Sequence, residues 1–147
     1  MDQLCKALLF EDTNNGDYYL AIVQYVAKIN TDKLISTISK LNRASGVKNG
    51  EGKEKKKPTI KIADEMMNDE LTGFKHNAVS PLGLRRPEKI QVLVSEACVG
   101  VNGGYLYLGA GCEHTKLGIS VEDLIAVTDA EIGDYSEARV DFDDNTD

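Results

Sequence analysis

The first 45 residues alternate between apolar runs and polar breaks. Residues 4–10 (LCKALLF) and 18–27 (YYLAIVQYVA) are apolar over the length of a strand, and residues 12–16 (DTNNG) between them have the composition of a hairpin turn. This pattern predicts two adjacent, largely buried antiparallel strands. Thr31 has the character of a helix N-cap, and four apolar residues after it fall on one helical face: Leu34, Ile35, Ile38 and Leu41. We expect this helix, which ends after Ser45, to cover one side of the sheet.

Shorter elements follow in the rest of the chain. Segments rich in β-branched, aromatic or alternating apolar residues predict four more strands, at residues 59–63, 90–94, 105–108 and 130–134. Asp64 and Ser120 can each cap a helix, the first running through Leu71. Strands in series with two or three helices between them predict an α/β or α+β domain with a mixed, mostly antiparallel sheet and a few covering helices.

The length and the cysteines limit the class of protein. A chain of 147 residues is one domain of ordinary size, which we place at residues 1–136, followed by an acidic and flexible tail at 137–147. Its three cysteines are widely spaced, which favours neither a disulfide framework nor a zinc ribbon and indicates a reducing, cytoplasmic setting. The apolar runs are too short for a membrane span, so we expect no membrane partner.

The net charge of −7 argues against a protein that coats nucleic acid, and we expect no DNA partner. The charge is uneven, because residues 48–57 (KNGEGKEKKK) hold five Lys and two Glu. Two interpretations of this basic insertion remain open: a local contact with a phosphate backbone, or a solvated loop without a core to join.

Residues 71–84 (LTGFKHNAVSPLGL) form the most informative segment. It is too apolar for a linker and too rich in Gly, Asn and Pro for a helix or a central strand. Gly73 ends the preceding helix, Asn77 is the non-glycine residue type that best tolerates positive φ, and Pro81 with Gly83 fixes a second turn. We interpret the segment, called the cradle loop below, as a rigid cradle of backbone N–H groups.

The cradle loop resembles that of the YbaK/ProX-type aminoacyl-tRNA editing domains when it is taken with residues 5–9 (CKALL) and 107–124 (YLGAGCEHTKLGISVEDL). In that family a Lys-x-Leu-Leu strand, a T-G-[YF] step, a G-x-x-x-P-x-G loop, a Gly-rich strand end and a D-L helix follow in this order. The chain departs from the pattern at Asn77 and Ala78, in the basic insertion, and in having only five residues before Lys6, so that a wall of the pocket is expected to be absent.

The resemblance implies hydrolysis, without a cofactor, of the ester of mischarged aminoacyl-tRNA, by trans-editing of the prolyl-tRNA type. The alternative is a non-catalytic module of the same fold that binds tRNA or an aminoacyl-tRNA synthetase. The residues assigned to catalysis are Lys6, Asn77, Ala78, Val79, Ser80 and Asp134. Those assigned to substrate binding are His76, Pro81, Gly83, Gly109 and Gly111.

Each assignment has a structural alternative. Lys6 is either a point charge that holds the ester or an edge-strand lysine facing water. The backbone N–H groups of residues 78–80 form either an oxyanion hole or an ordinary turn, and Ser80 before a proline is also ordinary turn chemistry. Asp134 either pairs with Lys6 or orients water, or it is a surface cap.

The remaining histidines and cysteines are weaker candidates. His76 either shuttles a proton or is a bystander. Cys112 and His114 are too few and too close in sequence for a zinc site, and we expect no metal. Cys5 should point away from its strand neighbour Lys6, which argues against a catalytic thiol there.

Overall fold

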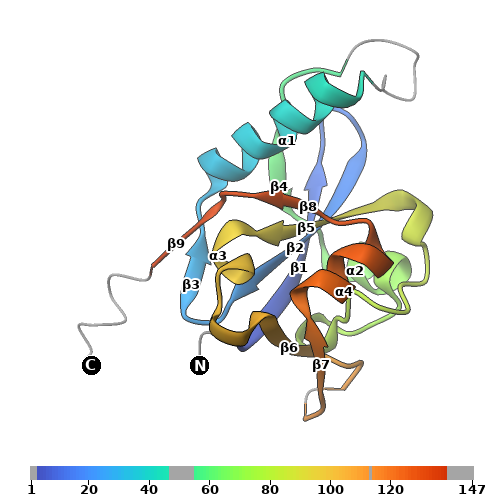
Figure 1. Ribbon diagram of the computed structural model, residues 1–147. Helices are drawn as coiled ribbons and strands as arrows, with labels where there is room; N and C mark the ends of the chain where they lie inside the picture. Colours follow the sequence, from blue (N-terminus) through green and yellow to red (C-terminus); the bar gives the residue numbers. More distant parts are fainter. Residues whose placement is uncertain (1–2, 47–54, 113, 139–147) are drawn as a thin grey trace, which may run out of the picture.

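The computed structural model describes residues 3–46, 55–112 and 114–138, and these form a five-stranded central sheet with small sheets and helices around it (Figure 1). The strand order is β4-β1-β2-β5-β8. Strand β1 pairs antiparallel with β2 and β4, whereas β2–β5 and β5–β8 are parallel pairs. The strands are β1 (Cys5–Asp12), β2 (Asp17–Gln24), β4 (Ile60–Ile62), β5 (Ile90–Ser95) and β8 (Glu131–Gly133).

Two antiparallel pairs lie beside the central sheet. One joins β3 (Ala27–Ile29) to β9 (Ser136–Ala138), and the other is the hairpin of β6 (Tyr105–Gly109) and β7 (Lys116–Ser120). Four of the six strand pairs in the described part of the chain are therefore antiparallel, which confirms the predicted fold class. Strand β9 carries regular structure to Ala138, two residues past the predicted domain end, and residues 139–147 of the predicted tail lie outside the described residues.

Within the described residues, four α-helices and three 3₁₀ turns connect these strands. The α-helices are α1 (Thr31–Ser45), α2 (Glu65–Thr72), α3 (Glu96–Val99) and α4 (Val121–Thr128). The 3₁₀ turns are η1 (His76–Ala78), η2 (Pro87–Lys89) and η3 (Asn102–Gly104). Asp64 and Ser120 cap α2 and α4 as predicted, each accepting a hydrogen bond from a backbone N–H three residues later. The N-cap of α1 is Asn30 rather than Thr31, because the Asn30 side chain accepts the bond from the Lys33 amide at 3.0 Å.

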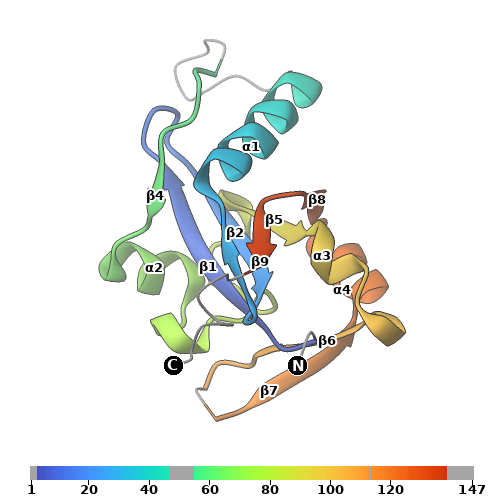
Figure 2. The same ribbon diagram turned by 90° about the vertical axis from the view of Figure 1, so that its left-hand side faces the viewer.

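Both faces of the central sheet are covered by apolar side chains. Strand β2 is therefore apolar at successive positions and not only at every second one. Leu20 and Ile22 belong to the larger core cluster, which also contains residues of α4 and β6. Tyr19 and Ala21 belong to a second cluster, in which Leu34 and Ile38 of α1 cover the other face. Figure 2 shows α1 beside the sheet and the β6–β7 hairpin at the end where β1 begins and β2 ends.

The basic insertion is described only at its C-terminal end. Lys55 forms an ion pair with Asp17 at 2.9 Å, and the backbone of Lys56 exchanges two hydrogen bonds with the Asn15 side chain. Residues 48–54 of the insertion lie outside the described residues. In the part of the chain that the structure describes, no helix is both long and apolar enough to cross a bilayer.

Candidate functional site

A cavity of about 170 Å³ lies where β1 begins, β2 ends and the cradle loop meets the end of β6. Four of the residues assigned from sequence, Lys6, His76, Val79 and Gly109, line it together. The described residues that line it are Cys5, Lys6, Ala7, Leu8, Tyr25, His76, Val79, Gly109 and Lys116. Residues far apart in sequence are therefore neighbours here, because the hairpin closes over the first strand.

The end of β6 holds the cradle loop through backbone contacts. A Cβ atom on Gly109 would lie only 2.7 Å from the Val79 carbonyl oxygen, so a side chain at residue 109 is incompatible with this approach. The Gly111 amide donates a hydrogen bond to the Ala78 carbonyl at 3.1 Å. These two glycines thus fix the position of the loop relative to the cavity.

Phe74 organises the rest of the loop. Its amide donates to Thr72 Oγ1 at 3.1 Å, and its carbonyl accepts from Asn68 Nδ2 at 3.0 Å. Its ring lies close to both Gly83 and Gly111, where an added Cβ would come within 3.9 and 3.2 Å of ring carbons. Gly83 and Gly111 both have positive φ, so they shape the loop around Phe74 and do not line the cavity.

The conformation of the loop corrects two details of the sequence-based interpretation. Asn77 is the middle residue of the right-handed turn η1, so the expectation of left-handed backbone there is wrong. The Ala78 amide donates to the Lys75 carbonyl at 2.9 Å, which removes it from the set of oxyanion-hole donors. The amides of Val79 and Ser80 are the donors that remain from that set.

The side chains of Ser80 and Pro81 have structural roles in this conformation. Both residues are buried, and Ser80 Oγ accepts a hydrogen bond from the Leu82 amide at 3.1 Å. This is the turn chemistry that was the alternative for Ser80. Neither residue lines the cavity.

Lys6 is half-buried, and its side chain is part of the cavity wall rather than a fully solvated group. Its neighbours Cys5 and Ala7 are buried on the opposite face of β1, as the strand alternation predicts. The Lys6 ammonium lies 5.5 Å from the centre of the Tyr25 ring, and the Lys116 ammonium lies at the same distance from that ring. Two cations therefore share one aromatic ring at the cavity.

Asp134 lies elsewhere, which corrects its assignment as a partner of Lys6. It follows β8, and β2 and β5 lie between β8 and β1, a separation of about 14 Å at ordinary strand spacing. Its exposed carboxylate pairs instead with Lys33 at 3.6 Å. Asp134 is therefore the surface residue that the alternative described.

Cys5 is buried against a second thiol. Its sulfur lies 3.7 Å from that of Cys98 in α3, and both side chains are fully buried. The hydrogen bond to Cys98 and burial raise the pKa of the Cys5 thiol, which keeps it protonated and unreactive at neutral pH. Cys112 and His114 are exposed, and the described residues contain no group of three or more potential metal ligands.

Sequence reasoning missed two residues with prominent places in the site, Tyr25 and Lys116. Tyr25 follows the end of β2, and its amide donates to the Leu4 carbonyl at 3.0 Å, so it lies beside the start of β1. Lys116 pairs with Gly109 in the hairpin register. A glycine at 118 and a polar residue at each end conceal the strand character of β7, but the spacing from Gly109 would have located Lys116 once the hairpin was known.

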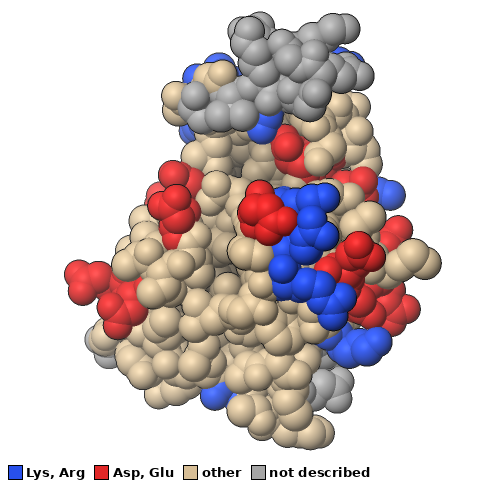
Figure 3. All heavy atoms as spheres, turned by 90° about the vertical axis from the view of Figure 1, so that its right-hand side faces the viewer, with Lys and Arg blue, Asp and Glu red and all other residues tan. Residues whose placement is uncertain are grey.

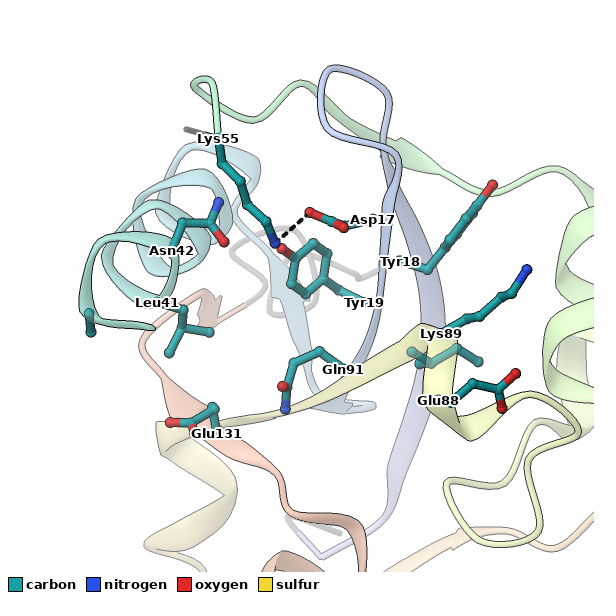
Figure 4. Close-up of a pocket in the computed structure, with 12 residues that line it drawn as sticks. Asp17, Tyr18, Tyr19, Leu41, Asn42, Lys55, Glu88, Lys89, Gln91 and Glu131 are labelled. Carbon is teal, nitrogen blue, oxygen red and sulfur yellow. Dashed lines mark ion pairs between the residues drawn. The ribbon is translucent and has the colours of Figure 1, made fainter. Parts of the chain in front are cut away.

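A larger cavity, of about 510 Å³, opens at the opposite end of β2 (Figure 4). Asp17 and Lys55 form an ion pair in its wall, and Tyr19 and Gln91 also line it. Burial, and the charges of Asp17 and Asp12, raise the pKa of Tyr19, which stays neutral. None of the residues assigned from sequence lines this cavity, so we place the candidate site at the smaller one.

No protein-family model and no curated protein sequence matches the chain. Several solved structures share its fold. Hypothetical protein APE2540 is 24% identical with a TM-score of 0.68, and the match covers 92% of this chain and 75% of that one. A candidate trans-editing enzyme for prolyl-tRNA synthetase is 22% identical with a TM-score of 0.69, covering 93% and 72%. A scaffold protein from computational epitope grafting is 20% identical with a TM-score of 0.69, covering 94% and 74%.

These likenesses show the fold. The chain is a mixed α+β domain similar to the structure of that candidate trans-editing enzyme, in agreement with the YbaK-like fold that the sequence motifs imply.

Proposed function

We propose that this protein hydrolyses the ester bond of mischarged aminoacyl-tRNA, as a trans-editing deacylase of the prolyl-tRNA type acting in the cytoplasm. The observation that carries the proposal is the common cavity of Lys6, His76, Val79 and Gly109, which come from three distant segments. The fold shared with a candidate trans-editing enzyme supports it.

The cavity offers the groups that ester hydrolysis requires. Negative charge develops on the carbonyl oxygen in the transition state, and donors fixed in advance stabilise it. In our proposal the Lys6 ammonium and the Val79 amide, which both belong to residues of the cavity wall, supply this stabilisation. His76 lines the same cavity, and an imidazole can exchange a proton with the attacking water near neutral pH.

Another cavity, of about 280 Å³, adjoins the candidate site and would hold the amino-acid side chain. The two share Ala7, Leu8 and His76 in their walls. The other described residues that line this adjoining cavity are Leu9, Ile62, Ala63, Glu65 and Asn68, and most of them are apolar. Such a space suits a small side chain, the class for which binding alone discriminates poorly and a hydrolytic check is useful.

A non-catalytic module that binds tRNA or a synthetase is the second candidate. The shortage of general bases at the site favours it. The described residues that line the cavity include no carboxylate, and the Ser80 hydroxyl accepts a hydrogen bond within its own turn. Of these groups, only the His76 imidazole is left to act as a general base. Under this function the site would hold the end of the tRNA without cleaving the ester.

Release of the amino acid from mischarged tRNA, compared between the wild type, Lys6→Ala and Lys89→Ala, separates the candidates. We expect Lys6→Ala to lower kcat/KM by about 100-fold, the usual effect of removing one oxyanion donor. Lys89 lies at the cavity of about 510 Å³ at the opposite end of β2, so its substitution should not affect the rate. Salt-sensitive tRNA binding without turnover would establish the non-catalytic function, and loss of activity on chelation would refute the assignment of the chemistry to these side chains alone.

A further inference from the structure

Three tyrosines are exposed next to the candidate site. Tyr25, Tyr105 and Tyr107, here called the tyrosine face, are 39%, 40% and 43% exposed. A soluble domain usually buries or half-buries such rings, and exposed aromatic side chains beside a cavity indicate a surface that meets a ligand.

The hydrogen-bond register places these rings on one surface. The Tyr25 amide donates to the Leu4 carbonyl, and Leu4 forms a parallel bridge with Tyr107, so the three residues lie side by side on neighbouring strands. Side chains paired in this way point to the same face of a sheet, which places Tyr25 and Tyr107 two strand spacings apart, about 10 Å. Tyr105 lies on the same face, two residues before Tyr107.

Gly118 allows the rings of the two hairpin tyrosines to pack closely against the backbone of the hairpin. It pairs with Tyr107, and an added Cβ would lie 2.8 Å from the Tyr105 ring and 3.1 Å from the Tyr107 ring. The two rings pack edge to face with their centres 5.6 Å apart. They are therefore fixed in place while part of each remains open to solvent.

Two lysines of the cavity, Lys6 and Lys116, lie next to the tyrosine face. Lys116 is paired with Gly109, on the same side of the hairpin as Tyr107, and it shares the Tyr25 ring with Lys6. No carboxylate occurs among the described residues that line the cavity. On the face shown in Figure 3, by contrast, Lys and Arg side chains border directly on Asp and Glu side chains.

Together these features point to one class of ligand. Aromatic rings on which bases stack, next to ammonium groups that meet phosphates, are how proteins bind single-stranded nucleic acid. We propose that the tyrosine face binds the single-stranded 3′ end of an RNA, with bases on Tyr107 and Tyr25 and a phosphate at Lys116 and Lys6. The inference deepens the proposed function and rests on it, because it states how the RNA that carries the ester reaches the cavity.

Binding of a fluorescent single-stranded RNA ending in CCA, without an amino acid, tests the inference by anisotropy on the full chain. Stacking on one ring corresponds to a fold-change of about 5 or more, so Tyr107→Ser should weaken binding at least fivefold and Tyr107→Phe should retain it. Lys116→Ala should weaken binding and lower the slope of log K against log salt by about 1, whereas Lys89→Ala should change neither.

Three outcomes would overturn the inference. The first is RNA binding that is unchanged in Tyr107→Ser and Lys116→Ala. The second is the absence of RNA binding by the wild type. The third is binding of vesicles rich in anionic lipid, lost in the same variants, without RNA binding. Equal melting temperatures of the variants and the wild type would show that the substitutions leave the fold intact.

The inference and the proposed function can fail separately. Hydrolysis of an aminoacyl-adenosine ester, which lacks the RNA chain, reports on the chemistry alone. If that ester is cleaved while Tyr107→Ser binds RNA normally, the inference fails and the function stands. If RNA binding depends on the tyrosine face but neither the small ester nor mischarged tRNA is cleaved, the deacylase function fails.

Discussion

Gly109→Ala is the substitution for which the structure gives the sharpest prediction. The new Cβ would lie 2.7 Å from the Val79 carbonyl oxygen, while ordinary contacts of a Cβ begin at 3.4 Å. The cradle loop must therefore move by about 0.7 Å, because the atoms in contact belong to its backbone and cannot rotate away.

Two opposing terms set the effect on stability. Overpacking of this kind costs about 1–3 kcal/mol. Alanine also restricts the unfolded chain, which returns about 0.4–1 kcal/mol. We expect a net loss of about 1–2 kcal/mol in the free energy of unfolding, measured by urea denaturation.

The effect on activity should be larger. A displacement of about 1 Å of a group that positions substrate lowers rates by about 100-fold. The loop displacement is somewhat smaller, so we expect kcat/KM for release of the amino acid from mischarged tRNA to fall by about 10- to 100-fold.

Gly100→Ala is the matched control. Its Cβ would be 4.0 Å from the nearest neighbouring atom, the Ala97 carbonyl oxygen, and its φ of −86° suits any residue. This variant should keep wild-type stability and rate. If Gly109→Ala behaved in the same way, the proposed clamp between β6 and the loop would be refuted; a loss of stability with a normal rate would remove Val79 from the chemistry.

The other predictions concern the core. Tyr135→Phe should lower the free energy of unfolding by about 1 kcal/mol in urea titrations, because the buried hydroxyl donates to the Ile22 carbonyl at 2.7 Å; an unchanged midpoint would contradict this. Burial raises the pKa of Tyr135 and Tyr19 above the unfolded value of about 10, so their stabilisation is complete below pH 10 and should decline above it by about 1.4 kcal/mol per pH unit for each tyrosine. Unfolding at pH 9 and 11 measures this decline, which should be smaller in Tyr19→Phe than in the wild type. Gly133→Ala should destabilise by about 1–3 kcal/mol, since its Cβ would meet the Thr37 side chain at 2.5 Å; a melting temperature equal to that of the wild type would count against it.

Much of the fold could be predicted from the sequence because its signals are local. The strand alternation of residues 59–63 is such a signal, and so is helix capping by Asp64 and Ser120. Both depend only on residues close by in the chain. The cradle loop was found for the same reason, since Gly and Pro act on the backbone at their own positions. Lys6 was found because a charged residue between apolar strand neighbours is unusual whatever lies around it.

The rest depends on which strands become neighbours. Asp134 was misplaced because its sequence position near a strand end does not reveal that β2 and β5 separate it from β1. Tyr25 and Lys116 were missed because they meet Lys6 only after the hairpin joins the start of β1. The turn at Asn77 was misjudged because residue preference for left-handed backbone is weaker than the contacts that hold the loop.

The residues that line the smaller cavity lie far apart in the sequence, and this determines when the cavity forms during folding. Lys6 and Lys116 come together only when long-range pairing of the hairpin with β1 is complete, and such non-local contacts form slowly because closing long loops costs entropy. A fragment that stops before residue 105 would contain the residues of β1, β2 and the cradle loop but would lack one wall of the cavity. During synthesis the chain should therefore acquire ligand affinity abruptly, only after the residues up to Lys116 have been made.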